Sequence, residues 1–152
     1  MIFAGIGSRL TPPHILEQMK SIAELLYRKG YILRSGGADG VDSAFESQYL
    51  DHKEIFYAGD ATPEGIEMAS QFHPAWNRCN EYARKLHGRN SMIILGENLD
   101  SPVDFVVAWT KKGQFVGGTG LGLRIAYKNE IPIYNLCFED DYKRLIEMIE
   151  SQ

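Results

Sequence analysis

The stretch DFVVAWTKKGQFVGGTGLG, residues 104–122, decides the fold that we expect from this sequence. It begins with an apolar run at 104–109, which is typical of a strand that a parallel sheet buries on both faces. A loop then leads into the glycine-rich segment 117–122 and into a helix expected from about 121 to 129. A buried strand, a glycine loop and a helix in this order are the repeating unit of open α/β sheets.

The same unit recurs along the chain. Apolar runs bounded by glycine or polar residues predict strands at 2–6, 31–34, 54–58, 104–109 and 131–136, whereas 93–95 is ambiguous. Segments of helical periodicity separate most of these strands, and the first helix should have Thr11 as its N-cap and Pro12 at its first position. We therefore expect an α/β domain over residues 1–152, a Rossmann-like open parallel sheet of about five strands with helices on both faces. The polar segment 59–98 should hang over the strand ends.

Three loops that follow predicted strands carry glycines, at 5–9, 35–42 and 117–124. The carboxyl ends of parallel strands meet at one edge of a sheet, and ligands bind there. Glycines let backbone N–H groups approach an anion, and the next helix directs its positive end to the same place. The third loop is the best phosphate cradle, because it has the most glycines, a hydroxyl at Thr119 and no acidic neighbour. The alternative is that the glycines only make tight turns.

These loops and the polar segment supply the ligand-binding residues that we predict. They are Gly7, Ser8, Arg9, Ser35, Gly36, Gly37, Asp39, Asp42, Trp76, Arg89, Asn90, Gly117, Gly118, Thr119, Gly120 and Arg124. The three arginines of this set, Arg9, Arg89 and Arg124, would hold a phosphate through bidentate donors. Asp39 and Asp42 have two open interpretations, as the N-cap and third residue of a helix or as acceptors for ribose hydroxyls or a base. Trp76, with His73, Asn77 and Arg78, fits either a pocket or loop packing.

The sequence shows no pattern typical of a nicotinamide site, a metal site or a defined catalytic group. Leu10 stands where a dinucleotide fingerprint has its third glycine, and no acidic residue ends the second strand, so we predict no nicotinamide cofactor. The histidines are scattered and the two cysteines form no CxxC pattern, so we predict no metal site. The catalytic residues remain unknown, and Asp42 and Glu46 are the candidate carboxylates because they share one helix face.

The overall composition limits the partners that we expect. The formal net charge of -4 argues against a generally basic nucleic-acid binder, since nonspecific affinity for phosphate backbones comes from Lys and Arg. The N-terminal stretch lacks a basic and an apolar targeting region, and no run reaches the length of a membrane span. We therefore expect a cytoplasmic protein that binds no membrane.

Several motifs, taken in order, resemble the SLOG superfamily, and its YpsA-related branch in particular. The motifs are Gly7-Ser8-Arg9, Ser35 to Asp42, Pro74-Ala75-Trp76, Gly88-Arg89-Asn90, Val106 to Trp109 and Gly117-Gly118-Thr119. This superfamily also includes the DNA-processing protein A family and the LOG family of cytokinin-activating phosphoribohydrolases. The resemblance implies a Rossmann-like sheet that binds nucleotides or their derivatives, lined by these glycine motifs. It also implies a homodimer.

The resemblance leaves three functions open. The first is binding or sensing of a nucleotide-type small molecule. The second is hydrolysis or transfer at a nucleotide N-glycosidic bond, as in the LOG family, although Val116, Leu121 and Arg124 replace the proline, threonine and glutamate of the LOG motif. The third is binding of single-stranded DNA, as in the DNA-processing family, with Arg9, Arg34, Arg89 and Arg124 as the basic residues.

Overall fold

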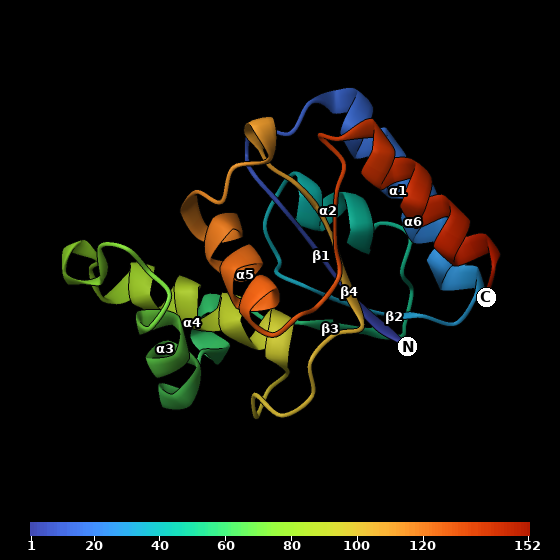
Figure 1. The fold of residues 1–152 in the computed structure, drawn as a ribbon. Coiled ribbons are helices and arrows are strands. Elements are labelled where there is room, and N and C mark those ends of the chain that lie inside the picture. Colours follow the sequence, from blue (N-terminus) through green and yellow to red (C-terminus); the bar gives the residue numbers. More distant parts are fainter.

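The centre of the molecule is a five-stranded parallel sheet, shown in Figure 1 in a computed structural model that describes residues 1–152. The strands lie in the order β3-β2-β1-β4-β5. Their bounds are β1 Ile2–Gly7, β2 Ile32–Ser35, β3 Lys53–Ile55, β4 Phe105–Trp109 and β5 Ile133–Asn135. Because β2 and β4 flank β1 on opposite sides, the loops that follow these strands diverge at a topological switch point. The predicted parallel α/β sheet is confirmed.

Helices cover both faces of the sheet (Figure 1). One face carries α1 (Pro13–Arg28), α2 (Val41–Glu46) and α6 (Glu139–Glu150), whose apolar residues join the core around Phe3 and Phe105. The other face carries α3 (Pro63–Ser70), α4 (Glu81–Leu95) and α5 (Gly117–Lys128), which share the second core. None of the helices combines the length and the apolar character that a membrane span requires.

The structure corrects the predictions for the segment 59–98. This segment contains α3 and α4 rather than an irregular insertion, and the ambiguous residues 93–95 form the last turn of α4. Ile93, Ile94 and Leu95 are all buried, because this end of α4 packs against the sheet and the neighbouring helices. A helix end buried on several sides reads as a continuous apolar run, which periodicity alone does not distinguish from a strand.

The predicted helix starts also need correction. The N-cap of α1 is Pro12 rather than Thr11, whose hydroxyl donates to Ser8 O at 2.6 Å. The N-cap of α2 is Gly40, which has φ +87° and no side-chain cap, so Asp39 and Asp42 do not form the proposed capping pair. Helix α5 begins at Gly117 instead of about 121, and the third glycine loop therefore supplies its first turn.

Close packing of α2 on the sheet explains one of the glycines that we assigned to ligand binding. A Cβ atom on Gly7 would overlap the side chain of Val41, and one on Gly5 would lie 2.6 Å from Phe45 Cδ2. The absence of side chains at these two β1 positions lets α2 approach the sheet.

Gly7→Ala should therefore destabilise the protein by about 1–3 kcal/mol through overpacking, measured by urea denaturation. The Val41→Ala exchange should relieve the overlap, so the double variant should be more stable than the sum of the two single effects predicts. Simple additivity would show that Val41 does not restrict position 7.

Candidate functional site

The loops after β1, β2 and β4 lie side by side at the carboxyl edge of the sheet. Gly7 pairs with Trp109 in the register of β1 and β4, and Ser8 N donates to Trp109 O at 3.1 Å. The hydroxyl of Ser35, at the end of β2, donates to Gly5 O of β1 at 2.7 Å. The segments that follow these three strands therefore begin next to one another, at the edge where open α/β sheets bind ligands.

Two neighbouring side chains of α4 connect the second glycine loop with the third. A Cβ on Gly36 would lie 2.5 Å from Arg89 Nη1, so this guanidinium lies directly against the second loop. Arg89 also donates from Nη1 to Phe56 O at 2.9 Å and from Nε to Asn90 Oδ1 at 2.9 Å. Asn90 Nδ2 in turn donates to Gly118 O of the third loop at 3.3 Å. The structure thus brings four predicted residues into one connected group.

Asp42 braces the second loop from α2. Its Oδ2 accepts from Ala38 N at 3.2 Å, and a Cβ on Gly36 would lie 2.7 Å from the same oxygen. Burial raises the pKa of Asp42, although Ala38 N–H, the Ser35 hydroxyl and the charge of Arg89 oppose this shift. The Ser35 hydroxyl lies 3.1 Å from Asp42 Oδ1 and 2.7 Å from Gly5 O, so it connects Asp42 with β1.

The other candidate carboxylate has a different partner. Glu46 Oε2 lies 3.0 Å from Lys53 Nζ of β3, with both side chains partly buried. Its negative charge contributes to the raised pKa of Asp42. Glu46 is therefore held in an ion pair with the sheet, although it shares a helix face with Asp42.

The third loop presents free backbone donors at the start of α5. Val116 caps this helix without any side-chain hydrogen bond, so the N–H groups of the first turn have no partner within the helix. Gly117 is exposed and has φ +66°, a left-handed conformation that favours glycine. Gly120, by contrast, is buried against the backbone of Phe115, and Arg124 Nη2 donates to Phe115 O at 3.0 Å. The guanidinium of Arg124 therefore supports the segment that leads into α5.

The first loop has fewer free donors than the third. The amide of Ser8 is bonded to Trp109 O, and its hydroxyl accepts from Leu10 N at 3.1 Å. Pro12 and Pro13 at the start of α1 have no N–H groups to offer. Arg9 is exposed at this edge and is the cation that the first loop contributes. Asp39 and Thr119 complete the predicted set at the same edge, Asp39 exposed and Thr119 half-buried.

One residue at this edge was missed by the sequence analysis. Tyr57 follows β3, and its ring lies so close to Gly37 that a Cβ there would overlap it. The residue is 54% exposed, so a ligand can reach its side chain. The sequence analysis placed Tyr57 inside a predicted strand at 54–58, whereas β3 ends at Ile55 and leaves Tyr57 in the following loop. Aromatic side chains stack on nucleic-acid bases without sequence preference.

Trp76 makes its contacts in a different place. It belongs to a one-turn 3-10 helix (Trp76–Arg78) between α3 and α4, and Arg84 lies over its ring at 5.1 Å. The rings of His73 and His87 are its aromatic neighbours, at 6.0 and 6.2 Å. We therefore find Trp76 with these side chains of the α3–α4 segment rather than against the glycine loops.

The same segment brings together three residues that the sequence analysis treated as scattered. Ligand atoms of His73, Cys79 and His87 all lie within 4.8 Å of one another. Burial lowers the pKa of His87, and the charges of His73 and Arg89 add to this shift. The prediction that no set of metal ligands emerges therefore overlooked this group, whose members are close because a short turn folds onto α4.

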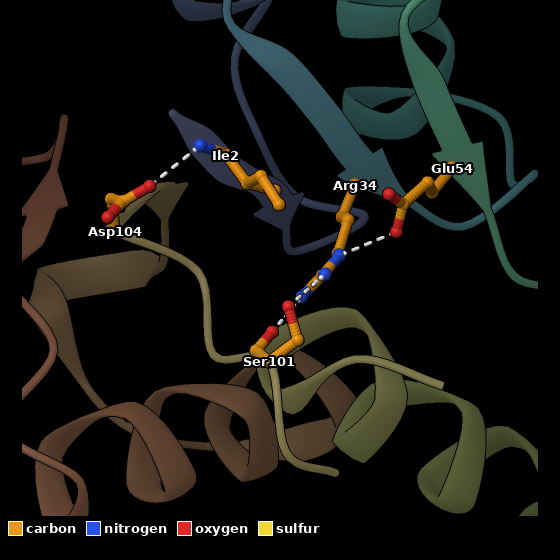
Figure 2. A network of polar contacts seen from close by, with 5 residues as sticks. All are labelled: Ile2, Arg34, Glu54, Ser101 and Asp104. Atoms are coloured by element: carbon orange, nitrogen blue, oxygen red, sulfur yellow. Dashed lines mark hydrogen bonds and ion pairs between the residues drawn. The ribbon is translucent and has the colours of Figure 1, made fainter. Parts of the chain in front are cut away.

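Arg34 is unavailable to a polyanion. Figure 2 shows its guanidinium between β3 and the segment before β4, bonded through Nε to Glu54 Oε1 at 2.8 Å and through Nη1 to Ser101 O at 2.5 Å. The side chain is only 4% exposed. The same figure shows Asp104, whose carboxylate accepts from Ile2 N at 2.7 Å. The proposed basic set for DNA therefore loses Arg34, which holds the sheet to this segment.

Comparison with known proteins identifies the fold but not a family. No family model matches the chain, and no curated protein matches it. The solved structure of DNA processing protein A from Helicobacter pylori, described for its single-stranded DNA binding mode, superimposes with a TM-score of 0.61 at 18% sequence identity. The match covers 89% of this chain and 64% of that chain. The two proteins share the fold, and this chain spans less than two thirds of the other.

Proposed function

We propose that this protein binds the phosphate group of a nucleotide or a nucleotide-derived small molecule at the carboxyl edge of its sheet. The observation that carries the proposal is the Arg89–Asn90 bridge between the second and third glycine loops. This bridge places a cation against Gly36 and fixes Asn90 on the first turn of α5. Uncapped helix N–H groups next to a fixed guanidinium form a favourable environment for a phosphate.

The neighbouring groups suit the rest of such a ligand. Tyr57 offers an exposed aromatic ring over Gly37, on which a base can stack. Asp39 is exposed at the end of the second loop and can accept hydrogen bonds from ribose hydroxyls. The ligand would then extend from the third loop, across the second, to the loop after β3.

The candidate site has no free carboxylate in the place of the LOG glutamate, which favours binding without hydrolysis. Arg124 stands where the LOG motif has its glutamate, and a guanidinium remains protonated and is no general base. Glu46 is engaged by Lys53, and Asp42 is half-buried under the second loop. We therefore propose a binding module or sensor for such a molecule rather than an N-glycosidic hydrolase.

A panel of nucleotides tests the proposal by thermal shift, with release of free base followed in the same samples. A ligand at ~100 times its Kd should stabilise the protein by about 2.7 kcal/mol. Stabilisation without base release supports the binding function. Base release would instead assign the hydrolytic function, and no shift with any nucleotide would contradict the proposal.

A second candidate, binding of single-stranded DNA, is favoured by the structural likeness to DNA processing protein A. Arg9, Lys111 and Lys112 are exposed in the loops after β1 and β4 and would contact the phosphates. The net charge of -4 opposes this candidate. DNA binding through these residues should weaken with salt, and Lys111→Gln with Lys112→Gln should reduce the slope of log K against log[salt] by about 1.4.

A further inference from the structure

We propose that His73, Cys79 and His87 form a binding site for a zinc ion. Their ligand atoms lie within 4.8 Å of one another, and all three side chains are half-buried. His87 belongs to α4, whereas His73 and Cys79 flank the turn between α3 and α4. In Figure 1 this segment lies on the face of the sheet opposite α1 and α6. The inference does not depend on the proposed nucleotide site.

The separation of two of the donors already matches a zinc centre. Cys79 Sγ lies 3.6 Å from His73 Nε2. Tetrahedral zinc with Zn–S near 2.3 Å and Zn–N near 2.0 Å separates a sulfur and a nitrogen ligand by about 3.5 Å. Since all three donors lie within 4.8 Å of one another, the third donor completes the arrangement by moving closer by at most about an ångström.

An unpaired buried nitrogen provides independent support. His87 Nδ1 is buried and has no hydrogen-bond partner. Buried polar groups almost always have a partner, and one without requires an explanation such as an ion. We therefore assign Nδ1 as the ligand atom of His87, since coordination would give this nitrogen the partner that the chain does not provide.

The donor set identifies the class of ion. Two imidazole nitrogens and one thiolate, with no carboxylate, suit zinc and exclude the hard cations Mg²⁺ and Ca²⁺, which take oxygen ligands. Three protein ligands leave the fourth tetrahedral position for water or an exogenous ligand. The expected ion is therefore Zn²⁺ with one exchangeable position.

Zinc binding changes the protonation of His73 and Cys79. His73 Nδ1 accepts from Ala75 N at 2.9 Å, so the neutral ring carries its proton on Nε2. Coordination through Nε2 moves that proton to Nδ1 and breaks the bond from Ala75, and the turn 74–78 must shift. The Cys79 thiol loses its proton to solvent and binds as thiolate. Each ion bound therefore releases close to one proton.

The experiment titrates the metal-free protein with Zn²⁺ against a chromophoric chelator, and with Co²⁺ as a spectroscopic probe. The protein should bind one ion per chain with release of about one proton, and the cobalt form should show a thiolate-to-metal charge-transfer band. Cys79→Ser and His87→Gln should each weaken binding at least 10-fold. Cys137→Ser is the matched control, because Cys137 lies outside the cluster, and it should bind as the unaltered protein does.

A second measurement avoids substitutions that could impair folding. Zn²⁺ should slow alkylation of Cys79 in the unaltered protein at least 10-fold and leave the rate at Cys137 unchanged, as followed by peptide mass spectrometry. Absence of protection at Cys79 would overturn the proposal. Equal affinity of the Cys79→Ser variant, or a cobalt spectrum without the thiolate band, would overturn it as well.

Discussion

Gly118→Asp should weaken binding of the best nucleotide from the panel by about 100-fold and leave the protein folded. Gly118 lies in the first turn of α5, where the uncapped N–H groups are proposed to hold the phosphate. A carboxylate there is close to the anion, and at an effective dielectric near 20 two like charges about 4 Å apart repel by roughly 4 kcal/mol. Partial solvation of the exposed edge reduces this to about 2–3 kcal/mol, which corresponds to about 100-fold.

The fold should tolerate the Gly118 exchange. Acidic residues in the first turn of a helix stabilise it through the helix dipole, by about 0.3–1 kcal/mol. A Cβ at position 118 would lie 3.0 Å from Asn90 Nδ2, a side-chain atom that can move slightly. Gly118→Ala and Gly118→Asn are the matched controls, because they introduce the same Cβ without the charge. Equal loss of affinity in all three variants would assign the effect to the disturbed Asn90 contact instead of to charge.

The sheet and the gathering of the glycine loops at its carboxyl edge were predictable because their signals are local. Buried parallel strands give uninterrupted apolar runs, as at Phe105–Trp109, and glycines after a strand mark the carboxyl edge. The parallel strands then bring the loops that follow them to one edge of the sheet, and no further sequence signal is needed to predict this. Arg89 and Asn90 were found by resemblance to family motifs, and their roles as bridges between loops follow only from the packing of α4.

The remaining features depend on contacts between segments far apart in the chain. Gly7 is a glycine because Val41 of α2 packs over it, and no local pattern contains that information. Asp39 and Asp42 have capping spacing, but the positive φ of Gly40 starts α2 one residue later than the pattern suggests. The histidine and cysteine cluster depends on how a turn folds onto α4, so its spacing matched no known metal motif.

Arg89→Met should reduce the free energy of unfolding by about 2 kcal/mol at neutral pH. Arg89 is the cation facing Asp42, which is half-buried and has Glu46 as its other charged neighbour. Both groups lie against Gly36 without a direct ion pair, so the loss combines their attraction with the bonds from Arg89 to Phe56 O and Asn90 Oδ1, and a hydrogen bond to a charged group contributes about 1.5–3 kcal/mol. Arg89 also has a lowered pKa through burial, which the charge of Asp42 opposes. Each of the two charges therefore stabilises the charged form of the other, and urea denaturation of the single variant measures the effect.

The pH dependence and a double variant separate the Asp42–Arg89 pair from the other contacts of Arg89. Burial raises the pKa of Asp42 above its unfolded value, so the ionised carboxylate is the less stable form in the folded protein and stability falls as pH rises through the raised pKa. Without Arg89 the pKa of Asp42 should rise further, so this fall should be larger and extend to higher pH, and the destabilisation by Arg89→Met should be smaller near pH 4 than at pH 7. Adding Asp42→Asn should restore part of the lost stability, because the amide needs no counterion. If the Arg89→Met effect is the same at both pH values and Asp42→Asn gives no recovery, the stabilisation comes from the bonds to Phe56 O and Asn90 instead.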